Sequence, residues 1–254
     1  MKLPLLCLAL LFPSCAAGAA APSGDFALAE LDLGPDCRLP EGTWREAFDF
    51  IRRNTSVEPD NEVLRLSPDA PLLYYRPFLT LSCGKAPRAL AYQEIAALRL
   101  YIAGGGTLLL NNSSGARRGS FEAWAGRLAG LLLPGAALEP LPAGHPLFKS
   151  FFLARGRGGR FDVQAAPEAA FYAGRAAILY SANDLAGIWP VSPAGAPVYP
   201  CLPGGEAQRL EGRRLFLNMV MYSLTGSYKE DAVHQPFLLE KMRRLAAGAA
   251  EELP

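Results

Sequence analysis

Two serines that follow an apolar run are the best placed residues for nucleophilic chemistry. Ser113 and Ser114 come directly after "TLLLNN" and before Gly115. At a sharp strand-to-helix turn, a nucleophile stands above a sheet beside the free N–H groups of the next helix. In "LLLNNSSGARRGSF" the turn to the next helix is long, however. This length favours a polar loop at the end of a strand over a nucleophile elbow.

A serine nucleophile also needs a general base, and the chain has two histidines. His145 stands ahead of Pro146, where a hydrogen-bonded loop histidine is the simpler interpretation, and His234 begins a predicted terminal helix. Neither has an acidic partner at an informative spacing. A catalytic pairing of Ser113 or Ser114 with His145 therefore has little support, and whether the chain is an enzyme stays open at this stage.

Polar residues at predicted strand ends are better candidates for binding. Asn111, Asn112 and Ser113 end one strand, and Asp184 and Trp189 lie in "SANDLAGIW" after another. Open α/β sheets bind ligands at the carboxyl ends of their strands. We expect these five side chains to gather at one sheet edge and to bind a protein partner or a small ligand. The alternative for the second segment is a loop held by an Asx turn and anchored by the tryptophan.

Composition and charge point away from several functional classes. The formal net charge is +1, so no overall field steers the chain toward nucleic acid. The basic run "RGRGGR" at 155–160 is interpreted as a mobile solvated loop instead of a nucleic-acid patch. No set of His, Cys and carboxylate residues has the spacing of metal ligands. We expect no metal, no cofactor and no nucleic-acid partner.

The beginning of the chain predicts export. Residues 1–21 contain one Lys, an apolar stretch and small residues, which is the pattern of a secretory signal peptide. We expect no transmembrane helix beyond this segment. The protein is therefore predicted to be periplasmic or extracellular, with lipid anchoring through Cys15 as the less favoured alternative.

Three cysteines follow the signal segment, namely Cys37, Cys83 and Cys201. An odd number cannot pair completely within one chain. One disulfide and one buried thiol are compatible with an oxidising compartment, but the spacing does not choose the pair.

The apolar pattern predicts alternating strands and helices. The helix at 43–54 carries a capping box of Thr43 and Glu46, and Leu131 and Leu132 in the helix at 119–135 are both expected to face inward. The order predicts a mostly parallel sheet between helices on both faces. The strands are expected at 26–33, 71–84, 107–112 and 176–184, and the helices at 43–54, 89–103, 119–135, 213–226 and 231–250.

A triple glycine at 104–106 follows one of these helices and precedes a strand. A phosphate-binding glycine loop has the reverse order, because the helix N-terminus must supply the free N–H groups. We therefore interpret the glycines as a helix C-cap and a tight turn.

Five segments in this order resemble a bacterial family, the domain-of-unknown-function family 4159, which has a class I glutamine amidotransferase-like fold. They are "PFLTLSCG", "YQEIAALRLYIAGGGTLLLNN", "HPLFKSFF", "ILYSANDLAGIW" and "RRLFLNMVMYSLTG". The resemblance implies one flavodoxin-like three-layer α/β domain at 25–226, followed by a helical tail at 227–254.

The resemblance also implies a location and a type of partner. Members of this family are secreted or membrane-tethered modules, sometimes joined to von Willebrand-type membrane proteins. Many have acidic residues where this chain has Asn111 and Asn112, and an amidotransferase has a cysteine where this chain has Ser113 or Ser114. We therefore predict a non-catalytic module of the cell envelope. A hydrolase or carbohydrate-processing enzyme that uses an elbow serine is the alternative, and a structural part of an assembly is a third hypothesis.

Overall fold

The computed structural model describes residue 24 and residues 26–225. The predicted signal segment, Cys15, His234 and the predicted tail helix lie outside the described residues. Within the described part, no helix is long and apolar enough to cross a membrane.

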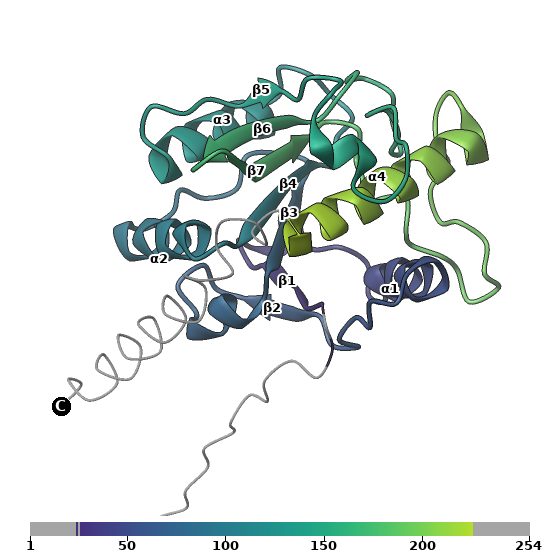
Figure 1. Ribbon diagram of the computed structural model, residues 1–254, viewed down its shortest axis with the longest axis horizontal. Helices are drawn as coiled ribbons and strands as arrows, with labels where there is room; N and C mark the ends of the chain where they lie inside the picture. Colours follow the sequence, from purple (N-terminus) through teal and green to yellow (C-terminus); the bar gives the residue numbers. More distant parts are fainter. Residues whose placement is uncertain (1–23, 25, 226–254) are drawn as a thin grey trace, which may run out of the picture.

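The centre of the structure is a seven-stranded sheet with the order β2-β1-β3-β4-β7-β6-β5 (Figure 1). Neighbouring strands from β2 to β7 are parallel, and β6 and β5 are added antiparallel. The predicted mostly parallel α/β architecture is thus confirmed. The strands are β1 (Leu28–Leu31), β2 (Leu64–Leu66), β3 (Phe78–Cys83), β4 (Thr107–Asn112), β5 (Glu139–Pro140), β6 (Glu168–Tyr172) and β7 (Arg175–Ser181).

Helices cover both faces of the sheet (Figure 1). The helices α1 (Thr43–Asn54) and α4 (Gly205–Thr225) bury one apolar core, and α2 (Tyr92–Ala103) and α3 (Ser120–Leu132) bury the other. Every residue of β3 and β4 is buried, as expected for strands covered on both faces. The sheet and the two pairs of helices on its faces therefore form three layers.

Three local predictions are wrong in detail. Residues 71–84 are not one strand, because Pro71–Tyr75 forms a 3-10 helix before β3 begins. There is no capping box at α1: Gly42 caps the helix, the Thr43 hydroxyl donates to the carbonyl of Pro40 (2.6 Å), and Glu46 pairs with arginines. Leu131 is 49% exposed, since the helix frame that buries Leu132 turns it outward.

The triple glycine forms the predicted turn. Gly105 has a φ of 96°, and a side chain on Gly106 would overlap the ring of Tyr101. The helix-to-strand order and the turn conformation agree with a structural role.

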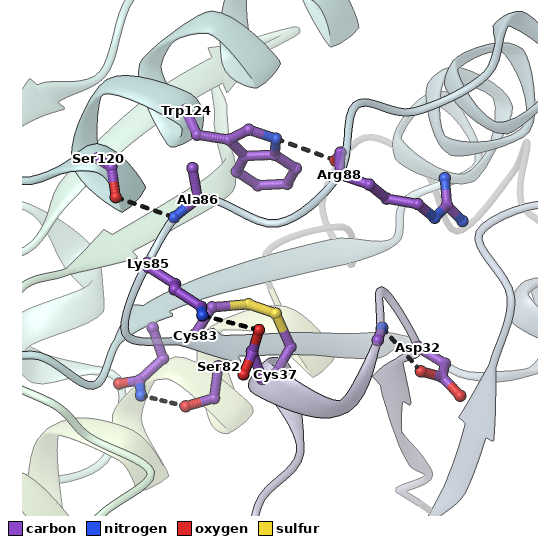
Figure 2. The surroundings of a disulfide bond; sticks show 12 residues. Asp32, Cys37, Ser82, Cys83, Lys85, Ala86, Arg88, Ser120 and Trp124 are labelled. Atoms are coloured by element: carbon purple, nitrogen blue, oxygen red, sulfur yellow. Dashed lines mark hydrogen bonds and ion pairs between the residues drawn. A yellow bond between two sulfur atoms is a disulfide. The ribbon is translucent and has the colours of Figure 1, made fainter.

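A disulfide joins Cys37 to Cys83, and Cys201 is a buried free thiol. The disulfide links the loop after β1 to the end of β3 (Figure 2). These two strands flank the point where the parallel strand order reverses, which is the usual ligand crevice of a doubly wound sheet. An ion pair between Lys85 and Asp36 (3.0 Å) spans the same two loops. This crevice is therefore bridged by a covalent bond.

The "RGRGGR" segment is packed against the domain, so the prediction of a solvated loop is wrong for its glycines. Gly158 and Gly159 are buried. Side-chain atoms on them would overlap the backbone of Gly212 in α4 and of Asn183 after β7, respectively. Three glycines thus permit close approach between α4, this segment and the end of β7.

We predict opposite effects for two helical glycines changed to alanine. Gly212→Ala places a methyl group 2.7 Å from the Gly159 nitrogen, and should destabilise the fold by about 1–3 kcal/mol. Gly126→Ala on α3 meets no atom within 4 Å, and should stabilise it by about 0.5–1 kcal/mol. Urea unfolding of both variants measures the difference. Equal free energies of unfolding would contradict the close contact.

Candidate functional site

The carboxylate of Asp184 is the centre of a buried polar network at the carboxyl edge of the sheet. The residue is 1% exposed. Its Oδ1 accepts hydrogen bonds from Asn111 Nδ2 (2.8 Å) and from the backbone N–H of Gly187 (3.0 Å). Its Oδ2 lies 3.0 Å from Nε of Arg160. The carboxylate is therefore occupied on both oxygens by groups of the protein itself.

The backbone conformation of Asp184 and the burial of its carboxylate both cost folding free energy. Asp184 has a φ of 55°, in the left-handed region that Asp tolerates better than most residues. A side chain on Gly187 would overlap the Asp184 carboxylate, so the glycine makes room for the acid. Burial raises the pKa of Asp184 above its ordinary value, although the hydrogen bonds from Asn111 and Gly187 and the positive charge of Arg160 oppose this rise.

Asn111 connects three segments of the edge. Its Nδ2 donates to Ser82 Oγ (2.8 Å) as well as to Asp184, and its Oδ1 accepts from the N–H of Ala186 (3.3 Å). An amide provides two N–H donors and a separate carbonyl acceptor, which these two donated bonds and one accepted bond use. An ionised aspartate at 111 has no donor and would face a second carboxylate. Many members of the family that the chain resembles have an acidic residue at this place. The asparagine found here instead suits a structural hydrogen-bond network.

Asn112 folds the turn that carries the two serines. Its Nδ2 donates to Tyr180 Oη (3.2 Å), and its Oδ1 accepts from both the N–H (3.0 Å) and the hydroxyl (2.7 Å) of Ser114. The hydroxyl of Ser114 also accepts from the N–H of Ala116 (3.1 Å). The Ser114 hydroxyl is therefore engaged in holding the turn.

Arg160 brings the network to the surface. Its Nη2 donates to the carbonyl of Ser113 (2.9 Å), and its side chain is 20% exposed. The guanidinium lies over the rings of Phe161 (4.4 Å to the centroid) and Tyr199 (4.9 Å). The guanidinium is therefore held in one orientation by a carboxylate, a carbonyl and two aromatic rings.

Trp189 does not belong to this edge cluster. It is fully buried, and its ring packs against Phe50 (5.8 Å) and Phe216 (5.3 Å) between α1 and α4. It anchors the loop after β7, which was the alternative for this segment. Of the five predicted residues, Asn111, Asn112, Ser113 and Asp184 come together, and Trp189 is part of the core.

His145 lies at the opposite end of the sheet from Ser113 and Ser114. Its ring contacts that of Tyr222, whose hydroxyl accepts from the N–H of Ala176 at the beginning of β7. The serines directly follow β4. Near the end of β4, Asn111 pairs with Ser181, which is the last residue of β7. The length of β7, about 20 Å, therefore separates the histidine from the serines. The predicted pairing of a serine with His145 is not formed.

Two further features are placed elsewhere. Burial raises the pKa of the Cys201 thiol, which lowers its reactivity at neutral pH.

A hollow of about 880 Å³ lies between α1 and the β1–β2 edge, with Glu30 at its floor. That carboxylate is already bonded to Trp44 (2.7 Å) and Arg65 (2.8 Å). Among the described residues, no group of three or more His, Cys, Asp and Glu is arranged to hold a metal ion.

Sequence reasoning missed Arg160, Phe161 and Tyr199. The missed signal is the pair of glycines directly before Arg160, because adjacent glycines allow a segment to pack closely on another backbone. Tyr199 lies in a proline-rich loop and has no periodic pattern that marks it.

Comparison with known proteins places the chain in one family. The family model described as "Domain of unknown function (DUF4159)" matches residues 35–224. No curated protein matches the chain.

We predict that the stability of the fold depends on pH through His145. Burial lowers the pKa of this ring from its ordinary 6.5, and its Nδ1 accepts a hydrogen bond from the N–H of Leu147 (3.2 Å). The unfolded chain therefore binds more protons just below pH 6.5, so the free energy of unfolding falls as the pH drops through this value.

His145→Asn keeps an acceptor for Leu147 but does not titrate. Denaturant unfolding at a series of pH values from 7.5 down to 5 should show a shallower pH dependence for the variant, by roughly the contribution of one titrating group. An identical pH dependence in both proteins would rule out this role of His145.

Proposed function

The chain belongs to the DUF4159 family, and we propose that it is a non-catalytic module of the bacterial cell envelope. In this proposal it binds a protein partner at the carboxyl edge of its sheet. The preorganised Arg160 carries the proposal, because its guanidinium is held by Asp184 and Ser113 and is stacked on two aromatic rings.

The surroundings of Arg160 favour a protein over a small ligand. Tyr199 belongs to an exposed loop in which Val198 is 47% and Leu202 is 56% exposed. The N–H of Leu202 donates to the carbonyl of Arg160 (2.8 Å), so this loop is tied to the arginine. Arginine and tyrosine are the residues that most often dominate binding energy at protein interfaces. We name the surface formed by Arg160, Phe161, Val198, Tyr199 and Leu202 the arginine surface.

The polar network supports binding more than catalysis. Both oxygens of Asp184 are occupied, Ser114 is engaged by its own turn, and His145 lies at the other end of the sheet. A reaction that uses Ser113 or Ser114 would need a base within hydrogen-bond reach. The interactions of these groups instead hold the edge in one shape.

Fold family and location complete the proposal. The parallel order β2-β1-β3-β4-β7 with antiparallel additions agrees with a class I glutamine amidotransferase-like fold. The disulfide between Cys37 and Cys83 agrees with an oxidising compartment, as does the leader-like beginning of the chain. We propose a periplasmic or extracellular location, and von Willebrand-type membrane proteins as the first partners to test.

We predict that Tyr199→Ala weakens the binding of such a partner at least about tenfold, because the ring supplies contact area and stacks on Arg160. Leu202→Asp should weaken it similarly. The matched control is Leu131→Asp on α3, which changes a residue of similar exposure on the other side of the sheet. The dissociation constant of the purified chain with the extracytoplasmic domain of the partner measures these effects.

Two results would count against the proposal. Unchanged affinity in both arginine-surface variants places the interface elsewhere. If the partner does not bind, a photo-crosslinking residue at position 199 in cells tests the surface itself. Failure to crosslink any protein would then contradict a protein-binding role.

The alternative, a hydrolase that uses an elbow serine, makes a separate prediction. We expect no labelling of the folded chain by a fluorophosphonate probe, since His145, the histidine that the structure describes, lies at the other end of the sheet from both serines. Labelling that disappears in Ser113→Ala or Ser114→Ala would revive the enzyme hypothesis.

A further inference from the structure

An apolar groove lies at the end of the domain opposite the arginine surface. It is a hollow of about 620 Å³ between the C-terminal parts of α2 and α3 and the β6–β7 turn. Its lining is predominantly apolar and includes Leu100, Leu132, Leu133, Pro134, Phe171 and Tyr172.

Several of these side chains are strongly exposed in the described part of the chain. Leu100 is 46%, Phe171 is 39% and Tyr172 is 41% exposed. Contiguous exposed apolar groups mark surfaces that another segment or molecule covers. The groove is therefore a candidate docking surface.

The described chain ends close to this groove. Its last helix, α4, ends at Thr225, one turn after Tyr222. The ring of Tyr222 lies 5.4 Å from that of His145, and the ring of His145 lies 5.8 Å from that of Phe171, which lines the groove. The described end of α4 is thus linked to the lining of the hollow by two ring contacts.

The sequence that follows has the pattern of an amphipathic helix. Leu238, Met242, Leu245 and Ala249 recur at the spacing i, i+4, i+7 and i+11, and Glu240 and Arg243 fall on the other side. Residues 226–234 reach up to about 30 Å when extended, which is several times the length of a single ring contact. A helix over 235–250 would be about 24 Å long.

We propose that residues 235–250 dock as a helix in the α2–α3 groove of the same chain, with Leu238, Met242 and Leu245 against Leu100 and Phe171. The proximity of the chain end favours this segment over a second copy or a foreign protein, because a short tether gives it a high effective concentration. The inference does not depend on the arginine surface, which lies at the other end of the sheet.

Cysteine crosslinking in the full chain tests the docking. Leu100→Cys combined with Met242→Cys should form a disulfide within one chain under mild oxidation. The control combines Leu210→Cys with Met242→Cys, because Leu210 on α4 is 41% exposed but does not line the groove. The groove pair should crosslink at least ten times faster than the control pair, at the mass of the monomer.

Each other outcome overturns the proposal. Equal rates for the two pairs mean that the tail has no preferred place, and no crosslink in either pair means that it lies elsewhere. A covalent dimer through Leu100→Cys and Met242→Cys assigns the groove to a second copy. Thermal unfolding of both double variants shows that each is folded before it is oxidised.

A second measurement uses variants of the tail alone. Leu238→Asp with Leu245→Asp should raise the fluorescence of an apolar dye severalfold by uncovering the groove. Arg243→Asp, on the other side of the predicted helix, should leave the fluorescence unchanged. An unchanged signal in the first variant would contradict the docking even if the cysteine pairs fail to fold.

Discussion

The buried carboxylate of Asp184 is the interaction on which the edge of this domain depends. A buried charge is tolerated only when it is paired and hydrogen-bonded. Here Asn111 comes from β4, Gly187 from the loop after β7, and Arg160 from the segment that crosses above them. Satisfying one acid thus fixes three parts of the chain that are far apart in sequence. The arginine that reaches the surface is positioned as a consequence.

Close backbone packing and a covalent link hold the remainder of the edge. The helix α4 and the crossing segment lie so close together that no side chain fits between them. This close approach depends on Gly158, Gly159 and Gly212. The disulfide between Cys37 and Cys83 bridges the crevice in which related sheet topologies hold their ligands. Both features reduce the freedom of the loops. A rigid edge of this kind is suited to presenting a surface, since less conformational entropy is lost when a partner binds.

The sequence predicted elements well where a single local pattern decides the structure. The apolar run of β4, the buried face of α1 and the glycine turn before β4 follow from burial periodicity and from backbone conformation. Features that depend on distant residues were not predictable. Asp184 and Asn111 were chosen as binding residues, but their partners Arg160 and Ser82 were not visible from spacing. Trp189 was expected at the edge, although the space between α1 and α4 determines its place in the core.

The central claim is that Asp184 positions Arg160, and a double-mutant cycle tests it most directly. The free energies of unfolding of Asp184→Asn, Arg160→Leu and the double variant would be compared with that of the original chain. We predict a coupling energy of about 2 kcal/mol, because Arg160→Leu leaves the buried carboxylate of Asp184 without its counter-charge. A coupling energy below about 0.5 kcal/mol, within the error of additivity, would show that the two side chains act independently and would contradict the account.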